Sequence, residues 1–64
     1  MKVFIYSKEG CTYCDHAVTL CETESLEYEK VMVSKDKLKE ICGESVSTYP
    51  QIFIDDRHVG TYFD

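Results

Sequence analysis

Two cysteines separated by two residues follow a short apolar run near the start of the chain, and this arrangement restricts the fold more than any other feature. The apolar run covers residues 3–6, residues 7–10 form a loop, and the cysteines are Cys11 and Cys14. Apolar and small residues then recur with helical spacing, which places Cys11 at the first turn of a helix. We therefore expect a strand, a loop and a helix, with Cys14 one turn beyond Cys11.

The position of Cys11 at a helix start predicts a reactive thiol. Free backbone N–H groups at a helix start carry partial positive charge and stabilise a thiolate more than a thiol. Lys8 adds a full positive charge three residues before Cys11. Because the thiolate is the nucleophilic form, we expect Cys11 to have a depressed pKa and to act as the nucleophile. Cys14 would then resolve the mixed disulfide by attacking Cys11.

The chain contains four cysteines, which allow three interpretations. A secreted protein with two disulfides would need an export signal, and the N-terminus has no such pattern. A zinc site would need four well-spaced ligands, but only Cys11 and Cys14 have suitable spacing, although His16 is close by. A redox-active Cys-x-x-Cys at a strand-to-helix junction needs no further ligand, and we favour this interpretation.

Length and charge narrow the class of function. The 64 residues suffice for one domain, residues 1–64, with a small core. No apolar stretch approaches the roughly 20 residues of a membrane span, and the N-terminus lacks a signal-peptide pattern. We therefore expect no membrane partner and a cytosolic location. The net charge of −5 disfavours nucleic acid and anionic membranes as partners.

The remaining pattern predicts the element order βαβαββ. Strands are expected at residues 2–6, 28–33, 51–54 and 58–60, and helices at residues 11–23 and 35–42. The first two strands should be parallel, and the last two should form a hairpin. The near-continuous apolarity of the first strand indicates that both of its faces are covered.

Helical spacing places four residues on the buried face of the first helix: Cys14, Ala17, Val18 and Cys21. Asp15 and His16 then face outward. We expect Cys21 to be a small core residue. Cys42 precedes Gly43, which is a suitable helix stop, and lacks activation by a helix start, so we expect it to be structural as well.

Three segments of the chain, residues 6–14, 48–55 and 58–64, together resemble the glutaredoxins of the thioredoxin-like superfamily. The specific set is the Cys-x-x-Cys, the Thr-x-Pro before a β-hairpin, and Gly60 after it. Tyr13 is typical of glutaredoxins, whereas Thr12 replaces the usual proline. The resemblance implies an α/β thioredoxin-like fold, with a four-stranded mixed sheet and two helices, and a glutathione-dependent thiol–disulfide oxidoreductase.

The resemblance also implies a glutathione site and no metal. Its residues would be Lys8, Tyr13, Thr48, Tyr49, Pro50, Gly60, Phe63 and Asp64. Lys8 would pair with a glutathione carboxylate, and a cis Pro50 would let the Tyr49 backbone pair with the cysteinyl part of glutathione. Ser47 replaces a frequent Arg or Lys, for which Lys37 or Lys39 could substitute.

The resemblance implies disulfide-containing proteins, among them ribonucleotide reductase, as partners. Glutaredoxins normally continue into a C-terminal helix, whereas this sequence stops at Asp64. We therefore expect an exposed apolar face on the sheet, through which the protein forms a homodimer or binds its target.

Three alternatives remain open from the sequence. Ser47 and Thr61, which replaces a second glycine of the family, favour a redox protein reduced by thioredoxin reductase instead of glutathione. The replacement of proline by Thr12 favours a carrier in which Cys11 of two subunits and two glutathiones hold a 2Fe–2S cluster. The third alternative is an inactive fragment without its last helix.

Overall fold

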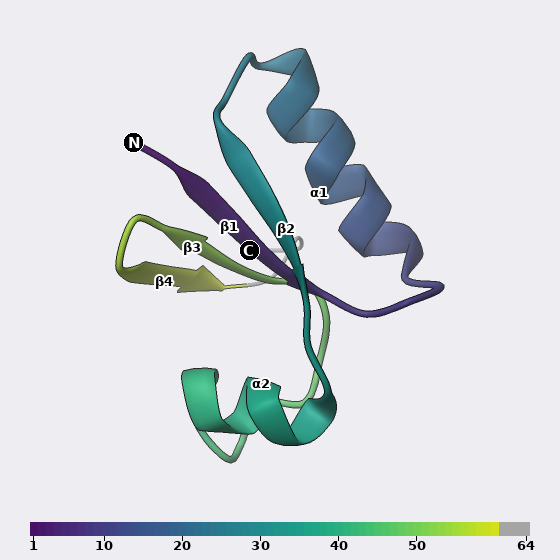
Figure 1. Cartoon of the computed structure of the whole chain (residues 1–64), viewed down its shortest axis with the longest axis vertical. Coiled ribbons are helices and arrows are strands. Elements are labelled where there is room, and N and C mark those ends of the chain that lie inside the picture. Colours follow the sequence, from purple (N-terminus) through teal and green to yellow (C-terminus); the bar gives the residue numbers. More distant parts are fainter. Residues whose placement is uncertain (61–64) are drawn as a thin grey trace.

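The computed structural model describes residues 1–60 and has the predicted element order (Figure 1). The elements are β1 (Val3–Ser7), α1 (Thr12–Thr23), β2 (Tyr28–Met32), α2 (Lys35–Cys42), β3 (Gln51–Ile54) and β4 (Arg57–Gly60). The bounds of α2 and β3 are those predicted. The bounds of the remaining elements differ from the predicted ones by one residue at most. The α/β thioredoxin-like fold expected from the sequence is therefore confirmed.

Within residues 1–60 the strands form one mixed sheet in the order β2-β1-β3-β4. β1 pairs with β2 in parallel and with β3 in antiparallel orientation, and β3 and β4 form the predicted antiparallel hairpin. The pairing of β1 with β2 continues past the strand ends, because the Val33 N–H donates to the Ser7 carbonyl over 3.0 Å. β1 therefore lies inside the sheet and leads directly into the cysteine segment.

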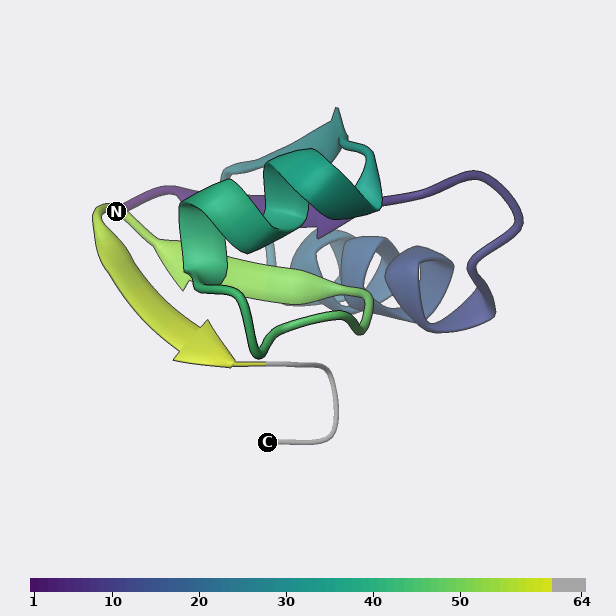
Figure 2. The ribbon, with the colours of Figure 1, turned by 90° about the horizontal axis from the view of Figure 1, so that it is seen from below.

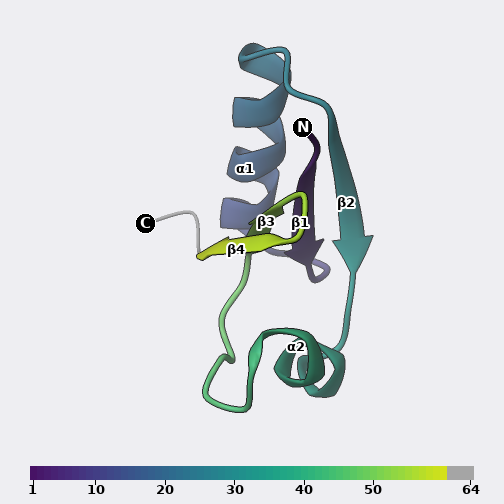
Figure 3. The same cartoon turned by 90° about the vertical axis from the view of Figure 1, so that its left-hand side faces the viewer.

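The core lies between α1 and one face of the sheet (Figure 3). The buried side chains of this core are Val3 and Ile5 of β1 and Ala17 and Cys21 of α1. Val18, Tyr28, Ile52 and Ile54 pack around them and are partly buried. The helix face predicted from spacing is thus the face that α1 buries, and Asp15 and His16 are exposed as expected.

The prediction that both faces of β1 are covered was wrong for the second face. Val3, Ile5 and Ser7 are buried, whereas the alternating residues Phe4 and Tyr6 are only half-buried. The physical reason is the position of α2, which lies opposite α1 but beyond the carboxyl end of β2 (Figures 1 and 2). Aromatic side chains instead cover one another there, and the rings of Tyr6 and Phe53 meet edge to face with centroids 5.3 Å apart.

Local signals in the sequence define both ends of α2. The hydroxyl of Ser34 accepts a hydrogen bond from the Lys37 N–H over 3.2 Å, which satisfies one of the free donors at the helix start. At the other end Gly43 adopts a φ of +110°, a conformation that side chains disfavour, and its N–H donates to the Lys39 carbonyl. Leu38 is fully buried and anchors the helix.

Candidate active site

Cys11 is the N-cap of α1, so the helix begins one residue later than predicted. Gly10, with a φ of +73°, turns the chain out of the loop that follows β1. The backbone of Cys11 is extended, and its Sγ accepts a hydrogen bond from the Cys14 N–H over 3.2 Å. The sulfur thus occupies the place that a serine or aspartate oxygen usually takes at a helix start.

Cys11 and Cys14 form a disulfide, and their Cα atoms are 5.2 Å apart. The two residues differ in accessibility, because Cys14 is fully buried while Cys11 is half-buried. A partner sulfur can therefore reach Cys11 but not Cys14.

The segment before β3 contains the predicted cis bond between Tyr49 and Pro50. Pro50 is fully buried, and the Tyr49 hydroxyl donates to the Val33 carbonyl over 2.8 Å. Thr48 is held by the amide of Gln51, whose Nε2 donates to the Thr48 carbonyl over 3.0 Å and to its hydroxyl over 3.1 Å. Polar contacts on both sides therefore hold the Thr-x-Pro segment in place.

The sequence interpretation missed the roles of Gln51 and His58. Gln51 is only 3% exposed, and its Oε1 lies 2.7 Å from His58 Nε2. Because Gln51 Nε2 donates to Thr48, its Oε1 is the acceptor and His58 Nε2 is the donor. The His58 ring also stacks on Phe53 with centroids 4.7 Å apart. The signal in the sequence was a glutamine at the start of an otherwise apolar strand.

Lys8 lies close to Tyr49, with its Nζ 5.5 Å from the centroid of the tyrosine ring. The structure therefore brings together two of the predicted glutathione-binding residues from segments that are far apart in the sequence. Both belong to loops at the carboxyl ends of β1 and α2.

The other predicted site residues are more dispersed. Tyr13 is 44% exposed, and its ring meets that of His16 edge to face at 5.7 Å. Gly60 ends β4 with a φ of +113°, whereas Phe63 and Asp64 lie outside the described residues. Of the two lysines that could substitute for the basic residue at position 47, Lys37 pairs with Glu40 at 3.9 Å. Lys39 lines a hollow of about 470 Å³ at the end of α2 with Asp36, Glu40 and Glu44.

The two remaining cysteines differ from Cys11 in their surroundings. Cys21 is buried in the core, where burial and then the charge of Glu22 raise the pKa of its thiol. Burial also raises the pKa of the half-buried Cys42 thiol. Residues 1–60 contain no cluster of three or more histidine, cysteine or acidic side chains able to hold a metal ion. In the same residues, no helix has the length and apolarity to cross a membrane.

Comparison with known proteins yields one consistent set of similarities. The sequence matches the glutaredoxin family model over residues 3–59. Glutaredoxin 1 of Escherichia coli K12 is 34% identical over 74 aligned residues, which include the whole chain and 87% of that protein.

Two solved structures are similar to the chain over nearly its whole length. Reduced Escherichia coli glutaredoxin has a TM-score of 0.78 and 33% identity, with 98% of this chain and 86% of that chain covered. Glutaredoxin 1 from Francisella tularensis, in complex with cacodylate, has a TM-score of 0.84 and 32% identity, with coverage of 97% and 84%. The region matched by the family model, residues 3–59, includes the cysteine pair, the Thr-x-Pro segment and most of the hairpin.

Proposed function

Because this chain belongs to the glutaredoxin family and is a thiol–disulfide oxidoreductase, we propose that it uses glutathione to reduce protein disulfides and glutathionylated substrates. The observation that carries the proposal is the half-buried Cys11 sulfur at the start of α1, with Cys14 buried behind it. Glutaredoxins use glutathione as their reductant, and this family property supports the choice of co-substrate.

In the first half of the proposed cycle, the Cys11 thiolate attacks one sulfur of the substrate disulfide. The substrate S–S bond breaks, a mixed disulfide with Cys11 forms, and the released substrate thiolate takes up a proton. Cys14 then loses its proton and attacks Sγ of Cys11. The products are the second substrate thiol and the Cys11–Cys14 disulfide.

In the second half, two glutathione molecules return the two electrons. The first attacks Cys11, forms a mixed disulfide with it and frees Cys14 as a thiol. The second attacks the sulfur of the bound glutathione, which leaves as oxidised glutathione and restores Cys11. Glutaredoxin potentials of about −200 to −230 mV fit this exchange with the glutathione pool.

We propose that glutathione lies between the cysteine loop and the Thr-x-Pro segment. The positive charge of Lys8 suits a carboxylate, and the backbone of Tyr49 before Pro50 suits pairing with an extended tripeptide. Thr48, Tyr13 and Gly60 belong to the same proposed site. Phe63 and Asp64 remain predictions from the sequence.

Turnover with glutathione and glutathione reductase, compared with turnover with thioredoxin reductase, tests the reductant. The expected result is turnover with glutathione only, and activity with thioredoxin reductase alone would overturn the proposal. The carrier alternative predicts a brown protein with visible absorption after anaerobic purification, whereas a colourless active enzyme supports the proposed cycle. The cycle needs reduced glutathione, so we propose the cytosol as its compartment.

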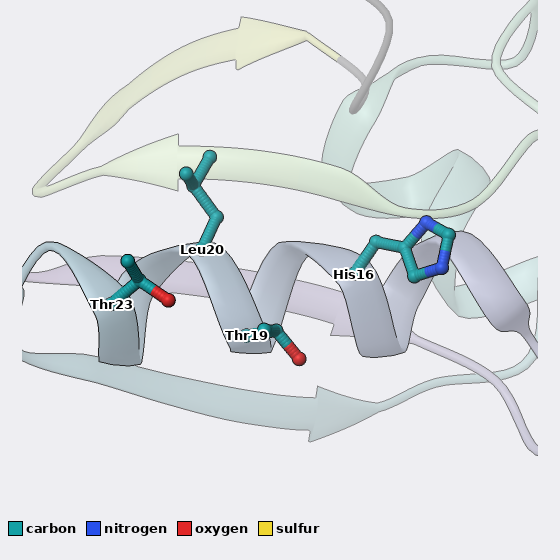
Figure 4. Close-up of a pocket in the computed structure, with 4 residues that line it drawn as sticks. All are labelled: His16, Thr19, Leu20 and Thr23. Carbon is teal, nitrogen blue, oxygen red and sulfur yellow. The ribbon is translucent and has the colours of Figure 1, made fainter.

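For the partners, we propose disulfide-containing proteins, with ribonucleotide reductase as one substrate to test. We also propose a second copy of the chain, bound through the uncovered face of the sheet. Self-association is supported by Leu20, an apolar side chain that is 52% exposed and points away from the axis of α1 (Figure 4). It lines a hollow of about 300 Å³ with His16, Thr19 and Thr23. Sedimentation of the full chain should show a dimer that Leu20→Glu dissociates, and a monomer at all concentrations would contradict this proposal.

A further inference from the structure

The ammonium of Lys8 lies over the aromatic ring of Tyr49, a residue that is far from Lys8 in the sequence. Its Nζ is 5.5 Å from the centroid of the Tyr49 ring, within the range of a cation–π interaction. Lys8 is an exposed residue in the loop between β1 and Cys11. Without a contact of this kind, its long side chain would sample many rotamers.

The Tyr49 ring is itself held in place. Its hydroxyl donates to the carbonyl of Val33 over 2.8 Å, just beyond the end of β2. The N–H of Val33 donates in turn to the carbonyl of Ser7, the residue before Lys8. The ring and the backbone that carries Lys8 are therefore both attached to the same end of the sheet.

Holding the lysine with a ring differs chemically from holding it with a carboxylate. Within residues 1–60 the lysine ion pairs are Lys2–Glu29, Lys30–Asp15 and Lys37–Glu40, so none of them involves Lys8. A carboxylate partner would neutralise the ammonium and compete with an anionic ligand. An aromatic face orients the ammonium and leaves its full charge available.

We propose that the Tyr49 side chain is a positioning residue, whose ring holds the Lys8 ammonium ready for a carboxylate of the incoming thiol substrate. This role is distinct from that of the Tyr49 backbone, and it rests on the proposed glutathione-dependent function. The proposal predicts that Tyr49 and Lys8 act on substrate binding as one unit.

A double-mutant cycle on the full chain tests this coupling, with steady-state reduction by glutathione as the assay. Tyr49→Val should raise the KM for glutathione about two- to fivefold with little change in kcat, the range expected for an exposed cation–π pair. Tyr49→Phe keeps the ring and should change the KM less. In a Lys8→Met background, Tyr49→Val should have no further effect.

The chain offers a matched control in Lys2, whose Nζ lies 5.4 Å from the centroid of the Phe4 ring. Lys2→Met removes a lysine that lies over a ring at a similar distance, and that also pairs with Glu29, near the other end of β1. It should leave the KM unchanged. Glutathione with its carboxylates esterified should be used equally by the wild type and by Tyr49→Val. This result would show that the effect acts through the carboxylate.

The outcomes separate this inference from the proposed function. Normal turnover with glutathione, together with additive effects of Tyr49→Val and Lys8→Met, would overturn the positioning role alone. No turnover of the wild type with glutathione would overturn both. If Tyr49→Val does not fold, proton NMR of the wild type tests whether Lys8 lies over the Tyr49 ring in solution. The ε-methylene protons of Lys8 should resonate upfield of those of Lys37, and coincident resonances would contradict the proposal.

Discussion

The backbone N–H of Cys14 donates a hydrogen bond to Sγ of Cys11 over 3.2 Å. The sulfur that caps the helix is therefore the same sulfur that is half-buried and open to a partner. An N–H donor at a helix start favours the negative charge of a thiolate over the neutral thiol. We therefore expect the local structure that begins α1 to activate Cys11 once the Cys11–Cys14 disulfide is reduced.

Substitution of the two cysteines by serine should have different consequences. Cys11→Ser should abolish all activity, but a serine hydroxyl caps helices well, so we expect the fold to persist. Cys14→Ser should lose protein disulfide reduction and retain removal of glutathione from glutathionylated substrates, because that reaction needs only Cys11. Steady-state assays with both substrate types measure the difference. Equal loss in both variants would contradict the assigned roles.

Alkylation of the reduced protein should distinguish Cys11 from Cys21 and Cys42. Burial raises the pKa of the Cys21 and Cys42 thiols, so their thiolate fractions should stay small at neutral pH and rise only in alkaline solution. Cys11 should react first as the pH rises. Iodoacetamide labelling at a series of pH values, followed by peptide mass spectrometry, gives the order. Reaction of Cys21 before Cys11 would be inconsistent with activation by the helix start.

Replacement of Gln51 by leucine should disturb the Thr-x-Pro segment. The variant loses the hydrogen bonds to both oxygens of Thr48 and to His58. Loss of a buried hydrogen-bond partner costs about 1–3 kcal/mol, and we expect a destabilisation of that size in urea unfolding. The KM for glutathione should also rise, because the segment that positions Tyr49 loosens. The variant His58→Phe retains the stacked ring, so it should be milder in both measurements.

The core between α1 and the sheet should be sensitive to the loss of one methylene. Ile5 is fully buried, and Ile5→Val should lower the free energy of unfolding by about 0.5–1.5 kcal/mol. Val59 is 42% exposed, and Val59→Thr should change the free energy of unfolding by less than about 0.5 kcal/mol. Chemical denaturation of both variants provides the comparison. Similar costs at the two positions would indicate that the core lies elsewhere.

The sequence by itself determined the order of the elements and, to within one residue, their bounds, because helical and strand periodicities and capping residues are local. The 35–42 helix is an example, since Ser34 and Gly43 define its ends without help from distant residues. The cysteine pair at a helix start was also evident from spacing alone.

Only the tertiary structure decided which distant side chains meet. The Gln51–His58 contact and the position of Lys8 over Tyr49 depend on the pairing of strands and on the paths of two loops. The partial burial of the second face of β1 depends on the position of α2 beyond the end of β2. Periodicity reports which side of an element is apolar, but not what covers that side, because the cover comes from segments brought together only when the chain folds.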